Sequence, residues 1–259
     1  MSDELTLEFD GSVAILSYNR PDKHNAFNNA ADAKLWELLA EIKDNKNLRA
    51  VVWRGNGKSF SSGRDLTEMG GRPEGISDLE FIENGHKNTK LFFEIEIPII
   101  VAIKGWAMGG SFQRALLCDM RIAGESAKMR LPEVTHGVLP DTGGTARLFQ
   151  IAGHGIAADM VYTGRVMDAE EALRHGVVSR VVADDQLDDT VLEVAHQISK
   201  SSAFAVKMFK RNLHNIANPE VQRSLTDEAL TQAMVFQSED YQEGKLARQQ
   251  GRDPDYKCR

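Results

Sequence analysis

Two glycine-centred turns, each preceded by a short apolar run, constrain most strongly how this chain can fold. The apolar runs are Ala50–Trp53 and Ile99–Ile103, and both are typical of buried strands. The turns that follow them are Ser61–Leu66 (SSGRDL) and Trp106–Ser111 (WAMGGS). Because glycine has no side chain to block a close approach, we expect the backbone N–H groups of both turns to be accessible to a ligand.

A third segment, Pro132–Thr145, adds two carboxylates to these turns. They belong to Glu133 and Asp141, and the Gly143–Gly144 pair follows the second. A pair of fixed N–H donors facing a thioester oxygen, with a carboxylate near the adjacent carbon, is what enolate chemistry requires. The three segments together therefore predict a site that combines fixed backbone N–H donors with two carboxylates.

Strand-like and helix-like patterns alternate up to about residue 185, and only helical patterns follow. The sequence predicts strands at 5–9, 13–18, 50–53, 99–103, 120–123, 128–130 and 177–182, and helices at 30–42, 78–93, 110–117, 145–163 and from 187 to about 239. Asp168 and Glu171 predict a capping box for a further helix that ends at Gly176. This alternation indicates an α/β core, which we place at residues 1–190, with a helical region at 191–259.

The composition argues against several classes of partner. A net charge of −7 disfavours nucleic acid or an anionic membrane as the main partner. No apolar stretch approaches membrane-spanning length and the acidic start has no signal-peptide pattern, so we expect a cytoplasmic protein. Cys118 and Cys258 do not make a disulfide framework, and no Cys or His spacing predicts a metal site.

Four segments in one order resemble the crotonase (enoyl-CoA hydratase/isomerase) superfamily. They are Asn19–Pro21 with Asn25–Ala26, Phe60–Leu66, Gly105–Cys118, and the Pro-Glu and Pro-Asp-x-Gly-Gly-Thr patterns within Pro132–Thr145. The resemblance implies a crotonase-like spiral of ββα units with a C-terminal helical trimerisation region, and a homotrimer or homohexamer. Packing of the last helices on the chain's own core is the alternative. The resemblance also implies an acyl-CoA thioester substrate and no separate cofactor, since coenzyme A is part of the substrate.

The resemblance assigns roles to individual residues. The backbone N–H groups of Arg64 and Gly110 match an oxyanion hole, and Glu133 matches the acid of the family's Pro-Glu segment. The other glutamate of the family's hydratases falls on Gln113. A glutamine cannot exchange a proton at neutral pH, so this departure argues against simple hydration by two glutamates.

Asp141 partly fills this gap. The arrangement is similar to that of dienoyl-CoA isomerases, in which a Pro-Glu acid and a later Asp move a proton between carbons. Chlorobenzoyl-CoA dehalogenases instead use an aspartate at this place as a nucleophile, and a third interpretation is that Asp141 only caps the helix near Thr145. Two carboxylates in one apolar pocket should have pKa values pushed apart. We predict Asp141 as the base and Glu133 as the acid.

His86 lies on a helix that in the family borders the acyl pocket, so it is a candidate site residue. The alternative interpretation is that His86 is a solvated helix residue with no role in the site. The predicted substrate contacts are Ala26, Ser62, Asp65, Leu66, Gly109, Gln113 and His86. Lys207 and Lys210 are candidate coenzyme A contacts or part of a solvated face, and Arg252 matches a basic residue near the family's C-terminus. The loop from about residue 69 to residue 77 should shape the acyl pocket.

These observations favour a cofactor-free acyl-CoA enzyme that stabilises a thioester enolate and isomerises or hydrates a C=C bond. Isomerisation is preferred because of Gln113 and Asp141. Two alternatives stay open. One is hydrolytic dehalogenation of an aryl-CoA, with Asp141 as nucleophile and His86 activating water. The other is a catalytically silent acyl-CoA-binding scaffold that has kept the fold.

Overall fold

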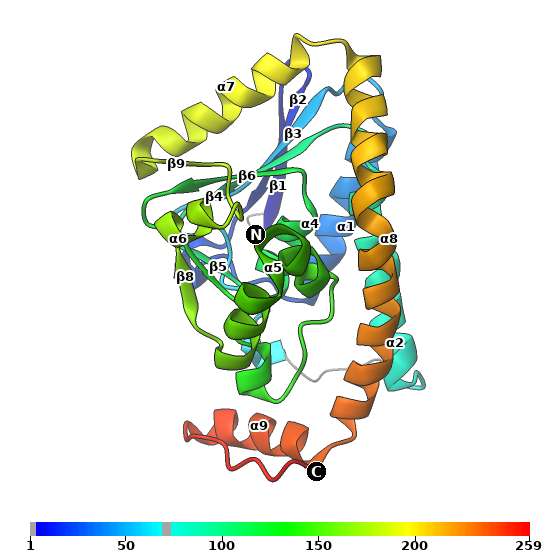
Figure 1. Cartoon of the computed structure of the whole chain (residues 1–259), viewed down its shortest axis with the longest axis vertical. Helices are drawn as coiled ribbons and strands as arrows, with labels where there is room; N and C mark the ends of the chain where they lie inside the picture. Colours follow the sequence, from blue (N-terminus) through cyan, green and yellow to red (C-terminus); the bar gives the residue numbers. More distant parts are fainter. Residues whose placement is uncertain (1–3, 69–73) are drawn as a thin grey trace.

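The computed structural model describes residues 4–68 and 74–259 as a mixed α/β chain (Figure 1). Most of the strands form a sheet with the order β1-β2-β3-β4-β6-β9. These strands are β1 (Leu5–Asp10), β2 (Val13–Tyr18), β3 (Ala50–Gly55), β4 (Ile99–Ile103), β6 (Met120–Gly124) and β9 (Arg180–Val182). The β1–β2 pair is the predicted antiparallel hairpin, and the other neighbours in this sheet pair in parallel. The predicted α/β core is confirmed.

A smaller sheet has the order β5-β7-β8, with β5 at Trp106–Met108, β7 at Lys128–Arg130 and β8 at Val166–Asp168. β5 pairs in parallel with β7, which pairs antiparallel with β8. Because β5 directly precedes helix α4 (Gly109–Leu117), this sheet fixes where the second glycine turn and the start of that helix lie.

The core lies on both faces of the larger sheet. Every residue of β4 is buried, as expected for a central parallel strand. One face packs against α7 (Leu187–Ser199), whose Leu187 and Val191 join a cluster with Val52 and Ile100. The other face packs in a larger cluster with α1 (Asn29–Asp44), α4 and α5 (Gly144–Thr163). The expected boundary between residues 190 and 191 therefore falls inside a helix that belongs to the core.

Local sequence signals start several helices where they were predicted. Asn28 accepts a hydrogen bond from the Ala31 N–H at the start of α1, and Asp168 accepts one from the Glu171 N–H at the start of α6 (Ala169–Arg174). Only half of the predicted capping box forms, because the Glu171 carboxylate pairs with Arg165 instead.

Some predicted bounds were wrong. The helix expected at 78–93 is two helices, α2 (Asp78–Thr89) and α3 (Leu91–Glu94), and the strand expected at 177–182 is β9 alone. The glycine-rich residues 69–73 of the predicted pocket loop lie outside the described residues.

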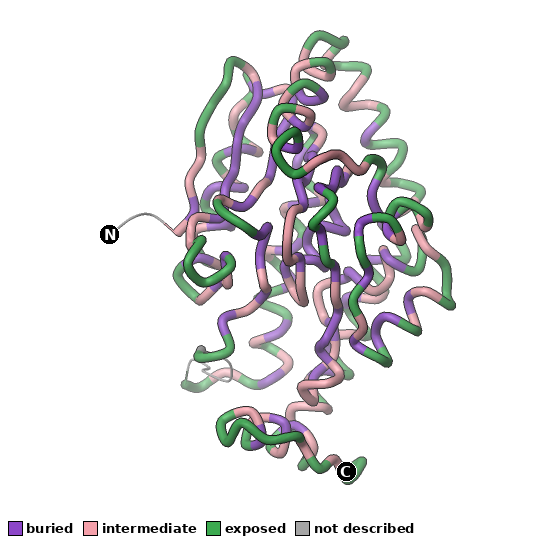
Figure 2. Tube along the Cα trace, turned by 90° about the vertical axis from the view of Figure 1, so that its left-hand side faces the viewer, coloured by how far each residue is buried: buried purple, intermediate pink, exposed green. Residues whose placement is uncertain are grey.

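The C-terminal region consists of the long helix α8 (Ala203–Phe236) and helix α9 (Glu239–Gln250). Figure 1 shows α8 running along one side of the molecule, beside α2. Helix α9 starts near the lower end of α8 and lies across the bottom of the molecule. Figure 2 shows that buried stretches gather in the middle of the molecule, whereas α9 is mostly intermediate or exposed. Within residues 4–68 and 74–259, no helix is both long and apolar enough to cross a membrane.

Candidate active site

A cavity of about 450 Å³ lies where α1, α2, α4, the Val138–Thr142 loop and the end of α8 meet. Its wall contains Arg64, Gly110, Gln113, Glu133 and Asp141, together with His86. The cavity therefore brings together the four predicted catalytic residues and two of the predicted substrate contacts. Its size is within the range of small-molecule sites.

The remaining predicted substrate contacts are not part of this wall. They are Ala26, Ser62, Asp65, Leu66 and Gly109. The Ser62 N–H donates to the His24 carbonyl, and Leu66 is exposed. The Asp65 carboxylate accepts hydrogen bonds from Thr67 and Arg20, which leaves it in a structural turn. Gly109 lies beside Glu133, since a Cβ at Gly109 would be 3.4 Å from Glu133 Oε1.

The two glycine turns are locked side by side by backbone hydrogen bonds. The Ser61 N–H donates to the Trp106 carbonyl at 2.8 Å, and the Met108 N–H donates to the Ser61 carbonyl at 3.0 Å. Gly63 has φ +88°, and a Cβ at this position would lie 2.7 Å from the Met108 carbonyl oxygen. Only glycine fits both the backbone conformation and this close approach.

The backbone amides of Arg64 and Gly110 lie in different local structures: Arg64 is in a parallel β-bridge, and Gly110 is at the start of a helix. Phe27 pairs with the two neighbours of Arg64, donating to the Gly63 carbonyl and accepting from the Asp65 N–H. In a parallel bridge of this kind the Arg64 N–H points away from Phe27. Gly110 lies in the first turn of α4, where N–H groups lack an intrahelical acceptor and favour negative charge.

Gln113 connects the two parts of the acidic segment. Its Nε2 donates to Glu133 Oε1 at 2.7 Å, and its Oε1 accepts from the Thr142 N–H at 2.9 Å. The backbone donor fixes which end of the amide is the carbonyl, so the NH₂ group must face the carboxyl. Glu133 Oε2 is buried and has no hydrogen-bond partner among the described residues.

Burial raises the pKa of Glu133 to about 7, against the opposing hydrogen bond from Gln113. Burial also raises the pKa of Asp141 to about 7, and the negative charge of Glu228 adds to this. The predicted divergence of the two pKa values is wrong. Loss of hydration is the largest cause for both groups, and the charge of Asp141 contributes less to the pKa of Glu133.

Asp141 does not cap the following helix. The N-cap residue of α5 is Gly143, which has φ +77° and no side chain that could bond to the helix. The capping interpretation is therefore wrong, and the Asp141 side chain belongs to the cavity wall.

His86 is 7% exposed, so its interpretation as a solvated helix residue is also wrong. Its Nε2 forms a short hydrogen bond with the main-chain carbonyl of Asp141. Since a carbonyl can only accept, Nε2 carries the proton. Burial lowers the pKa of His86, which favours this neutral form.

Two residues on α8 that complete the site were missed from the sequence. Glu228 accepts from the Gly143 N–H and Gln232 accepts from the Leu139 N–H, each at 2.8 Å. They lie on the side of the helix that also presents Val221 and Leu225 to Gly143. Their helical spacing from these apolar positions is the signal that could have identified them.

Arg114, also in the cavity wall, is a buried cation that the sequence did not single out. Its Nη2 lies 2.7 Å from Asp32 Oδ1, and its guanidinium lies 4.5 Å from the ring centre of Phe27 and 4.7 Å from that of Trp36. The carboxylate and the two ring faces compensate for the burial of this charge.

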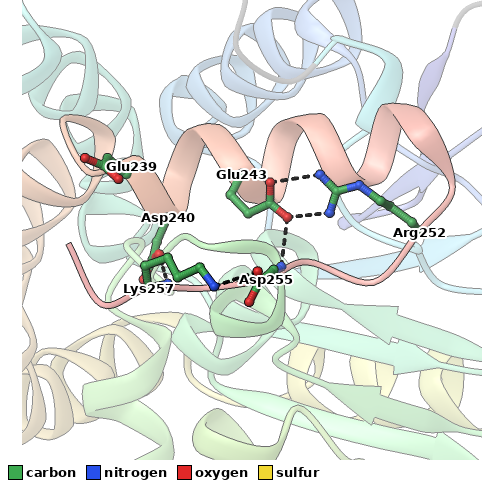
Figure 3. A pocket seen from close by; sticks show the side chains of 6 residues that line it. All are labelled: Glu239, Asp240, Glu243, Arg252, Asp255 and Lys257. Carbon is green, nitrogen blue, oxygen red and sulfur yellow. Dashed lines mark hydrogen bonds and ion pairs between the residues drawn. The ribbon is translucent and has the colours of Figure 1, made fainter.

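The basic residues proposed to contact coenzyme A have partners of their own. Lys210 is buried and donates to Asp119 and to the Ile97 carbonyl, each at 2.8 Å, and Lys207 pairs with Glu96. Arg252 borders a second pocket, of about 380 Å³, between α9 and the C-terminal tail (Figure 3). There its guanidinium makes a two-pronged ion pair with Glu243. This pocket shares no lining residue with the cavity.

Comparison with known proteins gives matches along nearly the whole chain. A family model described as enoyl-CoA hydratase/isomerase matches residues 8–259. A short-chain-enoyl-CoA hydratase of Clostridium acetobutylicum is 32% identical over 249 residues, covering 95% of this chain and 94% of the relative. A carnitinyl-CoA dehydratase of Escherichia coli is 36% identical over 265 residues, covering all of both chains. The crystal structure of an enoyl-CoA hydratase/isomerase from Pseudoalteromonas atlantica superposes with a TM-score of 0.87 at 31% identity, covering 98% of this chain and 100% of the other.

Proposed function

The chain belongs to the enoyl-CoA hydratase/isomerase family, and on that premise we propose that it shifts or hydrates the C=C bond of an enoyl-CoA through an enolate of the thioester. Its mixed α/β fold with a helical C-terminal region is the crotonase-like fold of that family. The observation that carries the proposal is the single cavity that holds Arg64 and Gly110 together with Glu133 and Asp141.

In this proposal the thioester oxygen accepts hydrogen bonds from the Arg64 and Gly110 amides. Negative charge builds up on that oxygen as a proton leaves the neighbouring carbon. Fixed N–H donors stabilise this charge, each contributing on the order of 3 kcal/mol. The first turn of α4 adds the favourable field of a helix N-terminus. The side chain of Arg64 bonds to Asn29, which leaves its amide as the catalytic group.

Asp141 and Glu133 would carry the proton. As a carboxylate, Asp141 takes a proton from the substrate, and the electron pair of the C–H bond moves toward the thioester oxygen. Glu133, protonated on Oε2, returns a proton at another carbon of the conjugated system. After this step Asp141 is protonated and Glu133 is a carboxylate. Since burial brings both pKa values to about 7, moving that proton back costs little free energy.

Isomerisation is the form of this chemistry that the site supports best. Gln113 already bonds to Glu133 and to the Thr142 N–H, so its amide holds these two groups in place. It cannot act as the second acid that activates water in hydration. Hydration or dehydration is the second candidate, because relatives that match 95% or more of the chain are named as a hydratase and a dehydratase.

Assays with a 3-enoyl-CoA and a 2-enoyl-CoA separate these forms. Conversion of the 3-enoyl to the 2-enoyl thioester, without a 3-hydroxyacyl product, would support isomerisation. Rapid formation of 3-hydroxyacyl-CoA from the 2-enoyl thioester would instead establish hydration. Binding of both thioesters without any turnover would contradict the proposal and favour the silent scaffold.

Hydrolytic dehalogenation is less well supported by the geometry. That reaction needs a group that activates water beside an aspartyl ester. The Nε2 of His86 bonds to the main-chain carbonyl of Asp141 and so holds the backbone instead. Glu133 also occupies the cavity, next to Gln113.

We predict a bell-shaped dependence of kcat/KM on pH with its maximum close to pH 7. Below this value Asp141 is protonated and cannot act as a base, because burial raises its pKa to about 7. Above it Glu133 loses the proton that it must donate, since its pKa is also about 7. Rates measured in buffers of constant ionic strength test this. A flat profile from pH 5 to 9 would contradict the assignment of the pair.

Assembly as a homotrimer or homohexamer and a cytoplasmic location are further proposals. The support for assembly is the set of large apolar side chains that α8 leaves exposed, which are Phe204, Phe209, Leu213, Ile216, Leu230 and Met234. Burying such side chains between subunits would be favourable. Sedimentation equilibrium should give the mass of three or six chains, and a monomer at micromolar concentration would contradict the proposal.

A further inference from the structure

The loop that carries Asp141 is held by side chains rather than by a sheet or a helix. Its backbone groups bond to four side chains: the Leu139 N–H to Gln232, the Asp141 carbonyl to His86, the Thr142 N–H to Gln113, and the Gly143 N–H to Glu228. These side chains come from α2, α4 and α8. The position of the Asp141 carboxyl in the cavity therefore depends on three helices at once.

Glu228 is the one acidic residue among these four side chains, and hydrogen bonds fix both of its carboxyl oxygens. Its Oε2 accepts from the Gly143 N–H at 2.8 Å, and its Oε1 accepts from the Ser224 hydroxyl at 2.7 Å. Ser224 lies one helical turn before Glu228 on α8, so the carboxyl is fixed from both sides. The bond to Gly143 also places Glu228 at the N-terminus of α5, where a negative charge is favoured. Burial raises the pKa of Glu228, and the hydrogen bonds from Ser224 and the Gly143 N–H oppose that rise and favour the charged form.

We propose that Glu228 is a positioning residue for catalysis, which fixes the Asp141 loop and keeps a negative charge beside the Asp141 carboxyl. The inference rests on the proposed function, in which Asp141 transfers a proton. Without Glu228, the loop would lose a backbone contact and Asp141 would lose the neighbour that makes its own negative charge less favourable. Asp141 would then be a weaker base at neutral pH.

The charges around Asp141 are balanced between this carboxylate and two arginines. Glu228 on α8 acts to raise the pKa of Asp141, whereas Arg114 on α4 and Arg64 act to lower it. Glu133 and Asp32 are further acids in the cavity wall. The pKa of Glu133 is raised in part by Asp141, and Asp32 pairs with Arg114. His86 on α2, whose pKa burial lowers, faces the loop in its neutral form. Removing Glu228 therefore leaves the two arginines as the dominant charges.

The test is Glu228→Gln, because glutamine can still accept from the Gly143 N–H while it carries no charge. The matched control is Asp227→Asn, which makes the same change of net charge at the exposed neighbouring residue on α8. We expect Glu228→Gln to shift the acidic limb of the kcat/KM profile to lower pH by about 0.5–1 pH unit. KM should stay nearly unchanged. We expect Asp227→Asn to match the wild type.

A direct measurement separates this inference from the proposed function. The pKa of Asp141 is followed by ¹³C NMR of carboxyl-labelled protein, with the signal assigned by its absence in Asp141→Asn. A lower Asp141 pKa in Glu228→Gln than in Asp227→Asn supports the inference, and equal values in the two variants overturn it. If the NMR value falls while the rate profile stays fixed, the positioning role stands and the use of Asp141 as the base is wrong.

Discussion

The Asp141→Asn variant should lose about a thousandfold in kcat for rearrangement of an enoyl-CoA, because an amide cannot accept the proton that the reaction removes. The side chain keeps its size and lies in the wall of the cavity, so binding of the thioester should change little. The loss should therefore appear in kcat, with KM within a few-fold of the wild-type value. Steady-state kinetics across substrate concentration give both quantities.

Asp185→Asn is the matched control, since Asp185 is exposed and lies outside the cavity wall. It should retain full activity. A second readout follows from the mechanism: exchange of substrate protons with deuterated solvent should be lost in Asp141→Asn and kept in the control. If Asp141→Asn retained both turnover and exchange, the base would have to be another group. A covalent ester trapped on Asp141 would identify a nucleophile and contradict the proton-transfer role.

The residues that sequence reasoning found share one property, which is that local signals mark them. An apolar run followed by glycine marks the end of a buried strand, and Arg64 and Gly110 are defined by such turns. Glu133 lies in a short motif that follows another strand. Each lies in the cavity because a neighbouring strand and turn place it there, so a few residues of sequence carry the information.

The residues that sequence reasoning missed depend on contacts between distant segments. Glu228 and Gln232 reach the Asp141 loop from a helix near the end of the chain, and the sequence does not show which face of that helix meets the loop. The separation of the pKa values of the two acids was also mispredicted. The expectation considered the charge of each acid on the other, whereas burial by surrounding elements is the larger cause.

Lys210 shows the same limit in the core. In sequence it resembles Lys207, because both are lysines on one amphipathic helix. In the structure Lys207 pairs at the surface with Glu96, whereas Lys210 is buried against Asp119. A side chain that looked suitable for coenzyme A therefore connects α8 to the start of β4, through the Ile97 carbonyl as well as the carboxylate.

Replacing Lys210 by methionine should lower the free energy of unfolding by about 3–5 kcal/mol, because it removes the lysine cation from the partly buried Asp119 carboxylate. Among the described residues, Asp119 would then keep only His214 and the Ile99 N–H as partners. The Ile97 carbonyl would lose its donor as well. Lys207→Met is the matched control three residues earlier on α8, and its exposed pair should contribute less than about 1 kcal/mol. Urea unfolding at one fixed protein concentration measures both changes.

The effect should also depend on pH in a defined direction. Burial opposes ionisation of Asp119, but Lys210 and the hydrogen bonds from His214 and the Ile99 N–H lower its pKa to about 2, below its ordinary value of 3.8. The stabilisation from this group is thus present above pH 3.8 and is lost as the pH falls toward 2. The difference in free energy of unfolding between wild type and Lys210→Met should shrink over that interval.

Adding Asp119→Asn to Lys210→Met should recover part of the stability at pH 7. Equal stabilities of Lys210→Met and Lys207→Met at pH 7 would show that the Lys210–Asp119 pair does not hold α8 to the core.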